Sequence, residues 1–266
     1  MTSTELWSVA SAPDLEVAVR GAVDPKDVVA VRREVGDVLH GYRVHEPARV
    51  RLSVHPEAGG SEVLAQINVR CRAAAVRVQV TGPGRFVAAL AADRLERQLI
   101  RCTAGAMPRA WPDPARPPLA FVSERRPITR RKSCTLLTGD PWEAQRALDE
   151  MDYDAHLFTC AETGEDAVIY RAGPFGVRLA RQHTVRPPVP AMPLTVHPHP
   201  ALVLTGDEAA ARLCRYGLPH LFFTDPADKR GRLLLRRYDG DLALIGPAEV
   251  TGIRLIDQEG EHLCDA

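Results

Sequence analysis

The feature that most limits how this chain can fold is a sequence pattern that occurs twice in its C-terminal half. The LTGD sequence at positions 137–140 returns at positions 204–207, an offset of 67. Three further matches share a smaller offset of 65, and they join 156–159 with 221–224, 168–171 with 233–236, and 177–179 with 242–244. We therefore expect two tandem β-α-β-β-β repeats. Asp140 and Asp207 are predicted to cap their helices, the second helix being slightly shorter because the offset falls from 67 to 65.

A unit of this size buries too little apolar surface to be comfortably stable alone. Because the tandem partner is supplied by the same chain, we expect the two repeats to pair within one molecule, which favours a monomer. The apolar and aromatic residues predicted to form the pairing core are Leu157, Phe158, Ile169, Tyr170, Phe222, Phe223 and Leu234.

Proline marks the joints between domains. Of the 22 prolines, six fall within 108–127 and six within 187–200. Such stretches form extended, semi-rigid spacers. The predicted organisation is a first domain at 1–107, a linker at 108–127, a first repeat at 128–183, a linker at 184–200, a second repeat at 201–250 and a tail at 251–266.

The first domain has strand and helix patterns of its own. Apolar residues alternate with polar ones in 15–21, 48–55, 62–70 and 74–80, which predicts four strands. Asp24 followed by Pro25 predicts the start of a helix that ends near Gly41, and a second helix is expected over 85–104. The order β-α-β-β-β-α predicts a small sandwich similar to double-stranded RNA-binding modules, so the whole chain is expected to be α+β.

The formal net charge of zero hides a segregated pattern. Residues 66–138 carry 14 basic and only 4 acidic side chains, whereas 139–266 carry 13 basic and 20 acidic ones. This asymmetry favours a nucleic-acid partner for the first domain. In the second helix, Arg94, Arg97 and Arg101 are predicted to lie roughly opposite an apolar side of Val87, Ala91, Leu95, Leu99 and Cys102. That stripe fits either a phosphate backbone or an ordinary solvated face, and both interpretations stay open.

Several classes of protein are disfavoured. The chain has no long apolar run and no leader-like start, so a cytoplasmic location is expected. Its six cysteines form no Cys-x-x-Cys pair, and His197 and His199 have no recognisable third ligand, so no metal is expected. No phosphate-binding glycine loop or nucleophile motif occurs. We expect a protein that is not an enzyme and holds no cofactor.

Two consecutive stretches carry a family resemblance. Residues 151–158 (MDYDAHLF) and 161–171 (AETGEDAVIYR) resemble the C-terminal signature of the long-form ribosome hibernation-promoting factors, the ribosome-associated inhibitor or sigma-54 modulation family. The likeness is greatest to the actinobacterial factors associated with hypoxia and dormancy. The element order of residues 14–104 resembles the family's N-terminal domain.

The resemblance implies a stress-response protein that binds ribosomal RNA of the small ribosomal subunit, in the mRNA and tRNA channel near the decoding centre. Such a protein inhibits translation and stabilises idle ribosomes. The residues to which it would assign rRNA contacts are Arg33, Arg49, Arg51, Arg70, Arg77, Arg85, Arg94, Arg97 and Arg101. A further RNA contact, or a solvated tether, is expected of the linker residues Arg125, Arg126, Arg130, Arg131 and Lys132.

The sequence departs from the family pattern in its second repeat. Residues 225–229 (DPADK) stand where the acidic turn would be. If this repeat occupies the pairing surface of the first, that surface is not free to join two ribosomes, so binding to single ribosomes is expected. The alternative is a regulatory module for transcription or stress signalling that binds another protein and has incidental RNA affinity.

Overall fold

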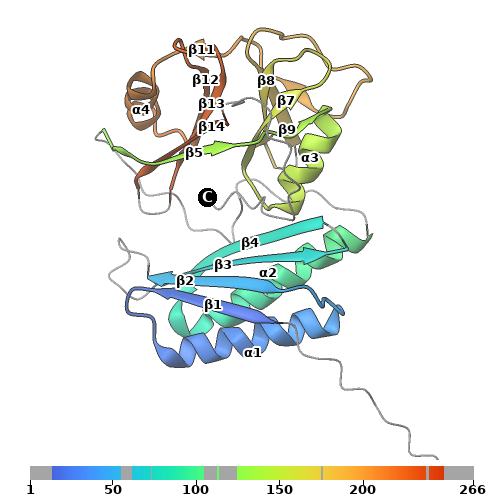
Figure 1. Ribbon diagram of the computed structural model, residues 1–266, viewed down its shortest axis with the longest axis vertical. Helices are drawn as coiled ribbons and strands as arrows, with labels where there is room; N and C mark the ends of the chain where they lie inside the picture. The colour runs from blue at the N-terminus through green and yellow to red at the C-terminus, as the bar shows by residue number, and fades with distance from the viewer. Residues whose placement is uncertain are drawn as a thin grey trace, which may run out of the picture. The chain divides into compact units, whose positions relative to one another are not determined.

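The computed structural model describes residues 14–54, 62–72, 74–104, 113, 125–174, 176–237 and 240–248 (Figure 1). The chain divides into two compact units, Met1–Ala106 and Met107–Ala266. No helix within the described residues is long and apolar enough to cross a membrane.

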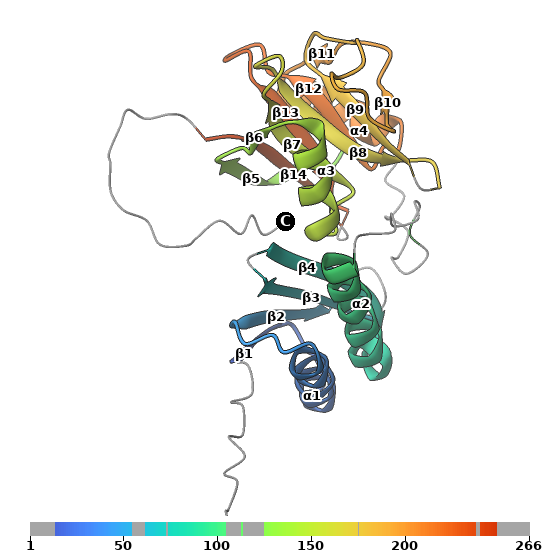
Figure 2. The same ribbon diagram turned by 90° about the vertical axis from the view of Figure 1, so that its right-hand side faces the viewer.

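The first unit is a four-stranded sheet covered by two helices. Its elements in chain order are β1 (Leu15–Arg20), α1 (Pro25–Gly41), β2 (Ala48–Val54), β3 (Glu62–Cys71), β4 (Ala74–Pro83) and α2 (Gly84–Ala104). The strands lie in the order β1-β2-β3-β4, with β1 and β2 parallel and the other neighbours antiparallel. Both helices lie on the same side of the sheet (Figures 1 and 2).

Local sequence signals explain these elements. The side chain of Asp24 accepts a hydrogen bond from the Lys26 N–H at 2.8 Å, and Pro25 occupies the first turn, so the predicted start of α1 is confirmed. The strand residues that face the helices are buried with the apolar sides of α1 and α2 in one core. The element order agrees with the sequence prediction, and the likeness to double-stranded RNA-binding modules stays a prediction.

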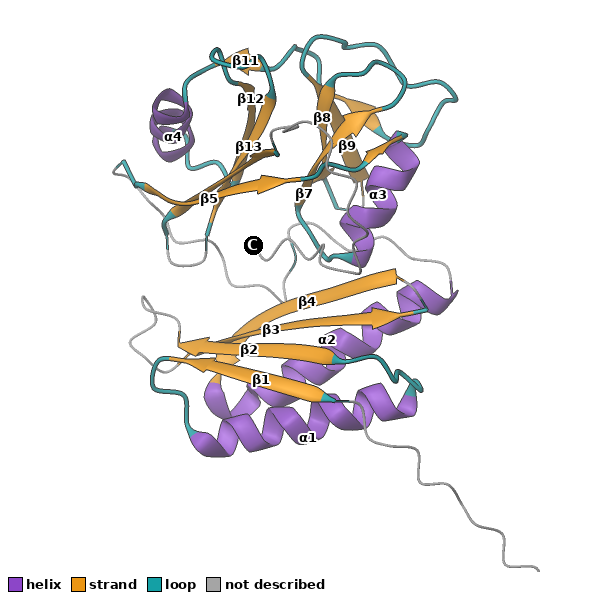
Figure 3. Cartoon of the chain, viewed as in Figure 1, coloured by secondary structure: helices purple, strands orange, loops and turns teal. Residues whose placement is uncertain are grey.

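The second unit contains two five-stranded sheets. Its elements up to residue 196 are β5 (Ile128–Cys134), β6 (Thr138–Gly139), α3 (Pro141–Glu150), β7 (Ala155–Cys160), β8 (Asp166–Ala172), β9 (Gly176–Arg181) and β10 (Thr195–Val196). The others are β11 (Leu202–Val203), α4 (Gly206–Arg215), β12 (His220–Thr224), β13 (Gly231–Arg236) and β14 (Leu242–Pro247). We call β6–β9 with α3 the first half and β11–β14 with α4 the second half. The two helices lie on the outer sides and the sheets between them (Figure 3).

Each sheet of the second unit borrows one strand from the segment that precedes the other half in the chain. The sheet orders are β10-β9-β8-β7-β6 and β11-β12-β13-β14-β5. Thus β5, which precedes the first half in the chain, pairs with β14, and β10, which precedes the second half, pairs with β9. The two borrowed strands pair in equivalent registers. Arg130 lies opposite Ala243, and Thr195 lies opposite Arg178. The offset of 65 relates Arg130 to Thr195 and Arg178 to Ala243.

The same offset of 65 also holds for the helices, which corrects two predictions. Helices α3 and α4 are both 10 residues long, so the second is not shorter. Asp140 caps α3 as predicted, but α4 is capped by Thr205, not by Asp207. Thr205 and Glu208 form a capping box. The Thr205 hydroxyl accepts a hydrogen bond from the Glu208 N–H, and the Glu208 carboxylate accepts one from the Thr205 N–H. The LTGD match at an offset of 67 is therefore not a structural equivalence.

The capping box gives a direct prediction. Replacing Thr205 by alanine should lower the free energy of unfolding of the second unit by about 1 kcal/mol, because the Glu208 N–H loses its side-chain acceptor. Replacing Asp207 by alanine should have a smaller effect, since Thr205 provides the cap and the ion pair of Asp207 with Arg125 is exposed. Urea unfolding of both variants tests the assignment, and a larger loss for the Asp207 variant would contradict it.

The apolar residues of the second unit form three layers. The outer layers pack α3 and α4 onto their own sheets, and the inner layer lies between the sheets. Buried residues of the inner layer are Ala155, Leu157, Val168, Ala180 and Leu233, with Leu136, Tyr170, Phe222, Leu235 and Ile245 packed against them. The two sheets therefore pack face to face within one chain.

The predicted pairing core divides between these layers. Leu157, Tyr170 and Phe222 lie in the inner layer. Phe158 and Ile169 pack beneath α3, and Phe223 and Leu234 pack beneath α4, which corrects the prediction for these four residues. Neighbouring side chains in a strand point to opposite faces of the sheet, so adjacent residues cannot both pack in the inner layer.

Residues 184–200, predicted to be a linker, are held against the first half. The His197 N–H donates to the Leu179 carbonyl at 2.7 Å, and Arg178 Nε donates to Thr195 Oγ1 at 3.1 Å. Leu194 packs against the α3 core. This segment thus contains the borrowed strand β10. Of the predicted linker at 108–127, only Asp113 and residues 125–127 lie within the described residues, and the predicted tail lies outside them.

Candidate nucleic-acid interface

One face of the first unit's sheet carries arginines that solvent can reach. Arg49 and Arg51 alternate along β2 with Val50 and Leu52, which are buried against the helices. Arg49 is exposed and Arg51 is partly exposed. Arg49 lies opposite Asn68 of β3, and its guanidinium is 3.3 Å from the Glu16 carboxylate on β1. These side chains stand on the face of the sheet that the helices do not cover.

Other predicted residues on this face differ in exposure. Arg70 is exposed near the end of β3. Arg77 lies opposite Asn68 but is only 3% exposed, and its Nη2 donates to Gln79 Oε1 at 3.2 Å. The exposed arginines of this face can therefore meet a phosphate group directly, whereas Arg77 is already enclosed.

The opposite, helical side of the unit carries a second group of predicted residues. Arg33 of α1 and Arg85 and Arg97 of α2 are exposed. Arg33 pairs with Glu34 at 3.4 Å, and Arg97 pairs with Asp93 one turn earlier in the helix. The guanidinium carbon of Arg85 lies 4.6 Å from the centre of the Phe86 ring.

The predicted stripe of three arginines on α2 is not one exposed surface. Arg94 is 4% exposed, and Arg101 is partly buried with a hydrogen bond to Gln98. At about 100° per residue, Arg94 lies only about 20° around the helix from Val87, so it stands at the margin of the buried side. Of the three, Arg97 alone is exposed.

The two faces of the first unit differ in their balance of charge. The helical face includes five carboxylates at Asp27, Glu34, Asp37, Asp93 and Glu96, whereas Glu16 and Glu62 are the acidic residues that alternate onto the open sheet face within the described strands. Exposed ion pairs such as Arg49 with Glu16 contribute only about 0–1 kcal/mol, so phosphate can replace the carboxylate readily. The described strands thus carry fewer carboxylates than the helices.

Further basic residues of the first unit are exposed but were not predicted from the sequence. Arg20 is exposed on β1, with the same alternation as Glu16, and Arg72 is exposed in the turn between β3 and β4 with a positive φ of 51°. Arg32, next to Arg33 on α1, is also exposed. The alternation of strand 15–20 was sufficient to place Arg20 on the same face as Arg49 and Arg51.

The basic segment at 125–132 is not a tether. Arg130, Arg131 and Lys132 belong to β5 and pair with β14. Arg125, Arg126 and Arg131 line a shallow pocket of about 380 Å³ together with Asp207 and Ala210 of α4. Arg125 also forms a 3.1 Å ion pair with Asp207. These groups could hold a phosphate, but on the folded second unit rather than on a linker.

The acidic turn of the first half, at Glu162 and Glu165, binds the segment at residues 183–186 that follows β9. The carboxylate of Glu165 accepts hydrogen bonds from the His183 N–H and from the N–H and hydroxyl of Thr184. Burial would raise the pKa of the Glu165 carboxyl, but these hydrogen bonds hold it below its ordinary value. Glu162 pairs with Arg186 at 3.0 Å and faces the fully buried guanidinium of Arg181 at 3.6 Å.

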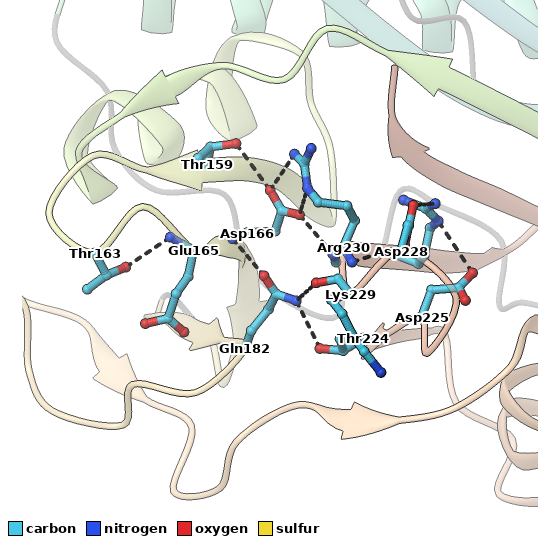
Figure 4. Close-up of polar contacts among 12 residues, drawn as sticks. Thr159, Thr163, Glu165, Asp166, Gln182, Thr224, Asp225, Asp228, Lys229 and Arg230 are labelled. Carbon is cyan, nitrogen blue, oxygen red and sulfur yellow. Dashed lines mark hydrogen bonds and ion pairs between the residues drawn. The ribbon is translucent and has the colours of Figure 1, made fainter. Parts of the chain in front are cut away.

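Asp166 connects the two halves of the second unit (Figure 4). Its carboxylate accepts two hydrogen bonds from Arg230, at 2.8 and 3.0 Å, and one from the Gly231 N–H at 2.8 Å. Burial would raise the pKa of this carboxyl, but the bonds from Arg230 and Gly231 and the charge of Arg230 outweigh burial and lower it. Gln182 donates to Thr224 Oγ1 and to the Lys229 carbonyl, which adds a second polar link.

The chain is similar to proteins of a known family. A sequence profile described as "Sigma 54 modulation/S30EA ribosomal protein C terminus" matches residues 123–179. Two proteins named "Dormancy associated translation inhibitor", from Mycobacterium tuberculosis strains CDC 1551 / Oshkosh and ATCC 25618 / H37Rv, are each 45% identical over 244 residues. The match covers 88% of this chain and 89% of each relative.

The chain belongs to the long-form ribosome hibernation factor family. The profile spans β5 to β9, so the family signature includes the strand that the second half borrows. The family and the relatives' name point to ribosome hibernation and translation inhibition, and neither names a catalytic activity. In this hibernation factor, the signature residues Glu162, Glu165 and Asp166 make the structural contacts described above.

Proposed function

We propose that this protein binds the small ribosomal subunit in the mRNA and tRNA channel near the decoding centre. It thereby inhibits translation and stabilises idle ribosomes under stress or dormancy. Family membership supports the ribosome as the partner. The rRNA-binding role is assigned to the first unit, with the open sheet face around Arg49, Arg51 and Arg70 as its centre.

The observation that carries this proposal is the row of solvent-accessible arginines on a rigid sheet with few carboxylates nearby. Proteins recognise folded RNA largely by shape and by contacts to phosphate and 2′-hydroxyl groups. Guanidinium groups fit phosphate oxygens in a forked geometry. Side chains that alternate along neighbouring strands are held at fixed spacings, which suits a phosphate backbone without reading a base sequence.

Sedimentation of the full-length protein with purified ribosomes tests the proposal. The protein should migrate with single ribosomes and small subunits at low salt. Between about 50 and 200 mM salt the affinity should fall by about 10³–10⁵-fold, as for a protein that makes about 6–10 phosphate contacts. Protein that stays at the top of the gradient at low salt would contradict the proposal and favour a regulatory module that binds another protein.

The second part of the proposal is that the protein acts on single ribosomes as a monomer. The inner face of the first half is covered by the second half of the same chain. A face that is already buried cannot join two ribosomes. Ribosome dimers that form on addition of pure protein would contradict this part while leaving ribosome binding intact.

A secondary rRNA contact is proposed at the pocket of Arg125, Arg126 and Arg131. Around α4, Arg212 and Arg215 flank the exposed Tyr216 ring at 5.4 and 5.7 Å, which extends the basic surface of the second half. Arg130 and Lys132 are less suited to this role than Arg131, because they do not line the pocket.

A further inference from the structure

Two corresponding positions of the two halves meet at the contact between the sheets. With the offset of 65, Glu165 and Asp166 of the first half correspond to Arg230 and Gly231 of the second. In the structure, Asp166 and Gly231 lie against each other, and the Gly231 N–H donates to the Asp166 carboxylate. The contact thus lies on the axis that relates the two halves.

The approach at this point leaves no room for a second side chain. A Cβ atom added to Gly231 would lie 2.5 Å from the Cβ of Asp166, and real Cβ atoms essentially never come within 3.0 Å of another heavy atom. It would also lie 2.9 Å from the Phe222 ring of the inner layer. The two sheets can therefore pack this closely only because one of the two positions is glycine.

The charges at this contact are complementary and not symmetric. The Asp166 side chain is 2% exposed and holds Arg230 in a forked ion pair. Arg230 stands where the first half has Glu165. A buried carboxylate that meets an arginine is stabilised, whereas the same carboxylate facing a second carboxylate is not.

Gln182 makes the contact still less symmetric. Its Oε1 accepts a hydrogen bond from the Asp166 N–H at 3.0 Å. Its Nε2 donates hydrogen bonds to Thr224 Oγ1 at 3.1 Å and to the Lys229 carbonyl at 2.8 Å (Figure 4). The corresponding residue of the second half is Pro247, which has no polar side chain. The first half supplies the carboxylate and the amide, and the second half supplies the arginine and the glycine.

We infer that the inner face of the first half is specific for a partner of the second-half type and excludes the first half of another copy of this chain. Two first halves packed in this geometry would place Asp166 against Asp166, with Cβ atoms overlapping and two carboxylates meeting at one largely buried point without an arginine between them. Two second halves would lose the carboxylate that holds Arg230. The contact therefore selects its partner both by attraction to the second half and by repulsion of another first half. The inference does not depend on what the first unit binds.

The test gives the second half the residues of the first in the full-length chain. The double variant Arg230→Glu with Gly231→Asp should lower the urea midpoint of the second unit by about 1 M or more, because it leaves the buried Asp166 carboxylate without its arginine and adds a clash. The matched control is Arg212→Glu with Gly206→Asp in α4, away from the contact between the sheets. A Cβ added to Gly206 makes only ordinary contacts, the nearest 3.6 Å from the Ile128 side chain. The control has the same change in charge and should leave the midpoint nearly unchanged.

A rescue variant separates partner specificity from a merely structural role. Adding Glu165→Arg and Asp166→Gly to the double variant exchanges the two pairs of residues across the contact. It should recover at least half of the lost midpoint, although Glu165 also holds Thr184. A double variant as stable as the unaltered protein, or a quadruple variant less stable than the double, would overturn the inference.

Two further measurements keep the inference testable if the double variant does not fold. Arg230→Glu alone adds no atom at the tight contact, and its deficit in urea midpoint should narrow as the pH falls from 7 towards 4, because protonation removes the new repulsion. The unaltered protein should sediment as a monomer at all concentrations. A dimer cross-linked through the inner face of its first halves would contradict the inference directly.

Discussion

Replacing Arg20, Arg49 and Arg70 together by glutamate is expected to remove the protein from the ribosome fractions of a sucrose gradient. All three side chains are exposed on the open sheet face. A hydrogen bond to a charged group contributes about 1.5–3 kcal/mol, so the loss of three such contacts should weaken binding on the order of a thousandfold or more. The dependence of affinity on salt should become shallower by nearly one unit for each lost phosphate contact.

The matched control for this variant lies on the opposite side of the same unit. Replacing Arg33, Arg85 and Arg97 by glutamate changes the charge equally, but on a face that already carries several carboxylates. We expect a clearly smaller loss of binding. If the helical-face variant loses more affinity than the sheet-face variant, the rRNA surface is on the helices and our assignment of the face is wrong.

Replacing Glu162 by glutamine should destabilise the second unit by about 3–5 kcal/mol, the usual cost of leaving a buried charge without its partner. The Arg181 side chain is fully buried and faces the Glu162 carboxylate at 3.6 Å. Urea unfolding followed by hydrogen exchange in residues 125–248 measures the loss.

Two further variants show whether this loss comes from the buried charge. Asp207→Asn removes an exposed ion pair of the same unit and should cost less than about 1 kcal/mol. Adding Arg181→Met to the Glu162 variant should recover much of the loss, because no charge is then left in the interior. If the double variant is no more stable than Glu162→Gln alone, the unpaired guanidinium is not the cause.

Local patterns in the sequence were sufficient to predict the first unit. Alternation in β2 and β3 and the Asp24–Pro25 start of α1 depend on nearby residues, and the structure has each of them. The position of Arg94 was predicted wrongly, because the stripe groups it with the other arginines although it lies close to Val87 around the helix. Burial at the margin of a helix depends on what packs beside it, which the sequence pattern alone does not contain.

Long-range pairing explains what could not be predicted in the second unit. The charged run of β5 looks like a linker, because strands at the edge of a sheet tolerate lysine and arginine. Its partner β14 lies at the other end of the unit's described chain, and no local pattern connects the two. Similarly, alternation separates Leu157 from Phe158, but which of them faces the other sheet depends on how the two halves pack.

The exchange of strands between the two halves also determines when the second unit can fold during its own synthesis. Strand β5 is made first, yet the edge to which it belongs is completed only by β14, which ends at Pro247. The sheet of the first half is likewise completed only by β10, which is translated after β9. Contacts between such distant residues slow folding, because a long loop must close before they form. The unit is therefore expected to reach its native state in one late step, once β14 has been translated.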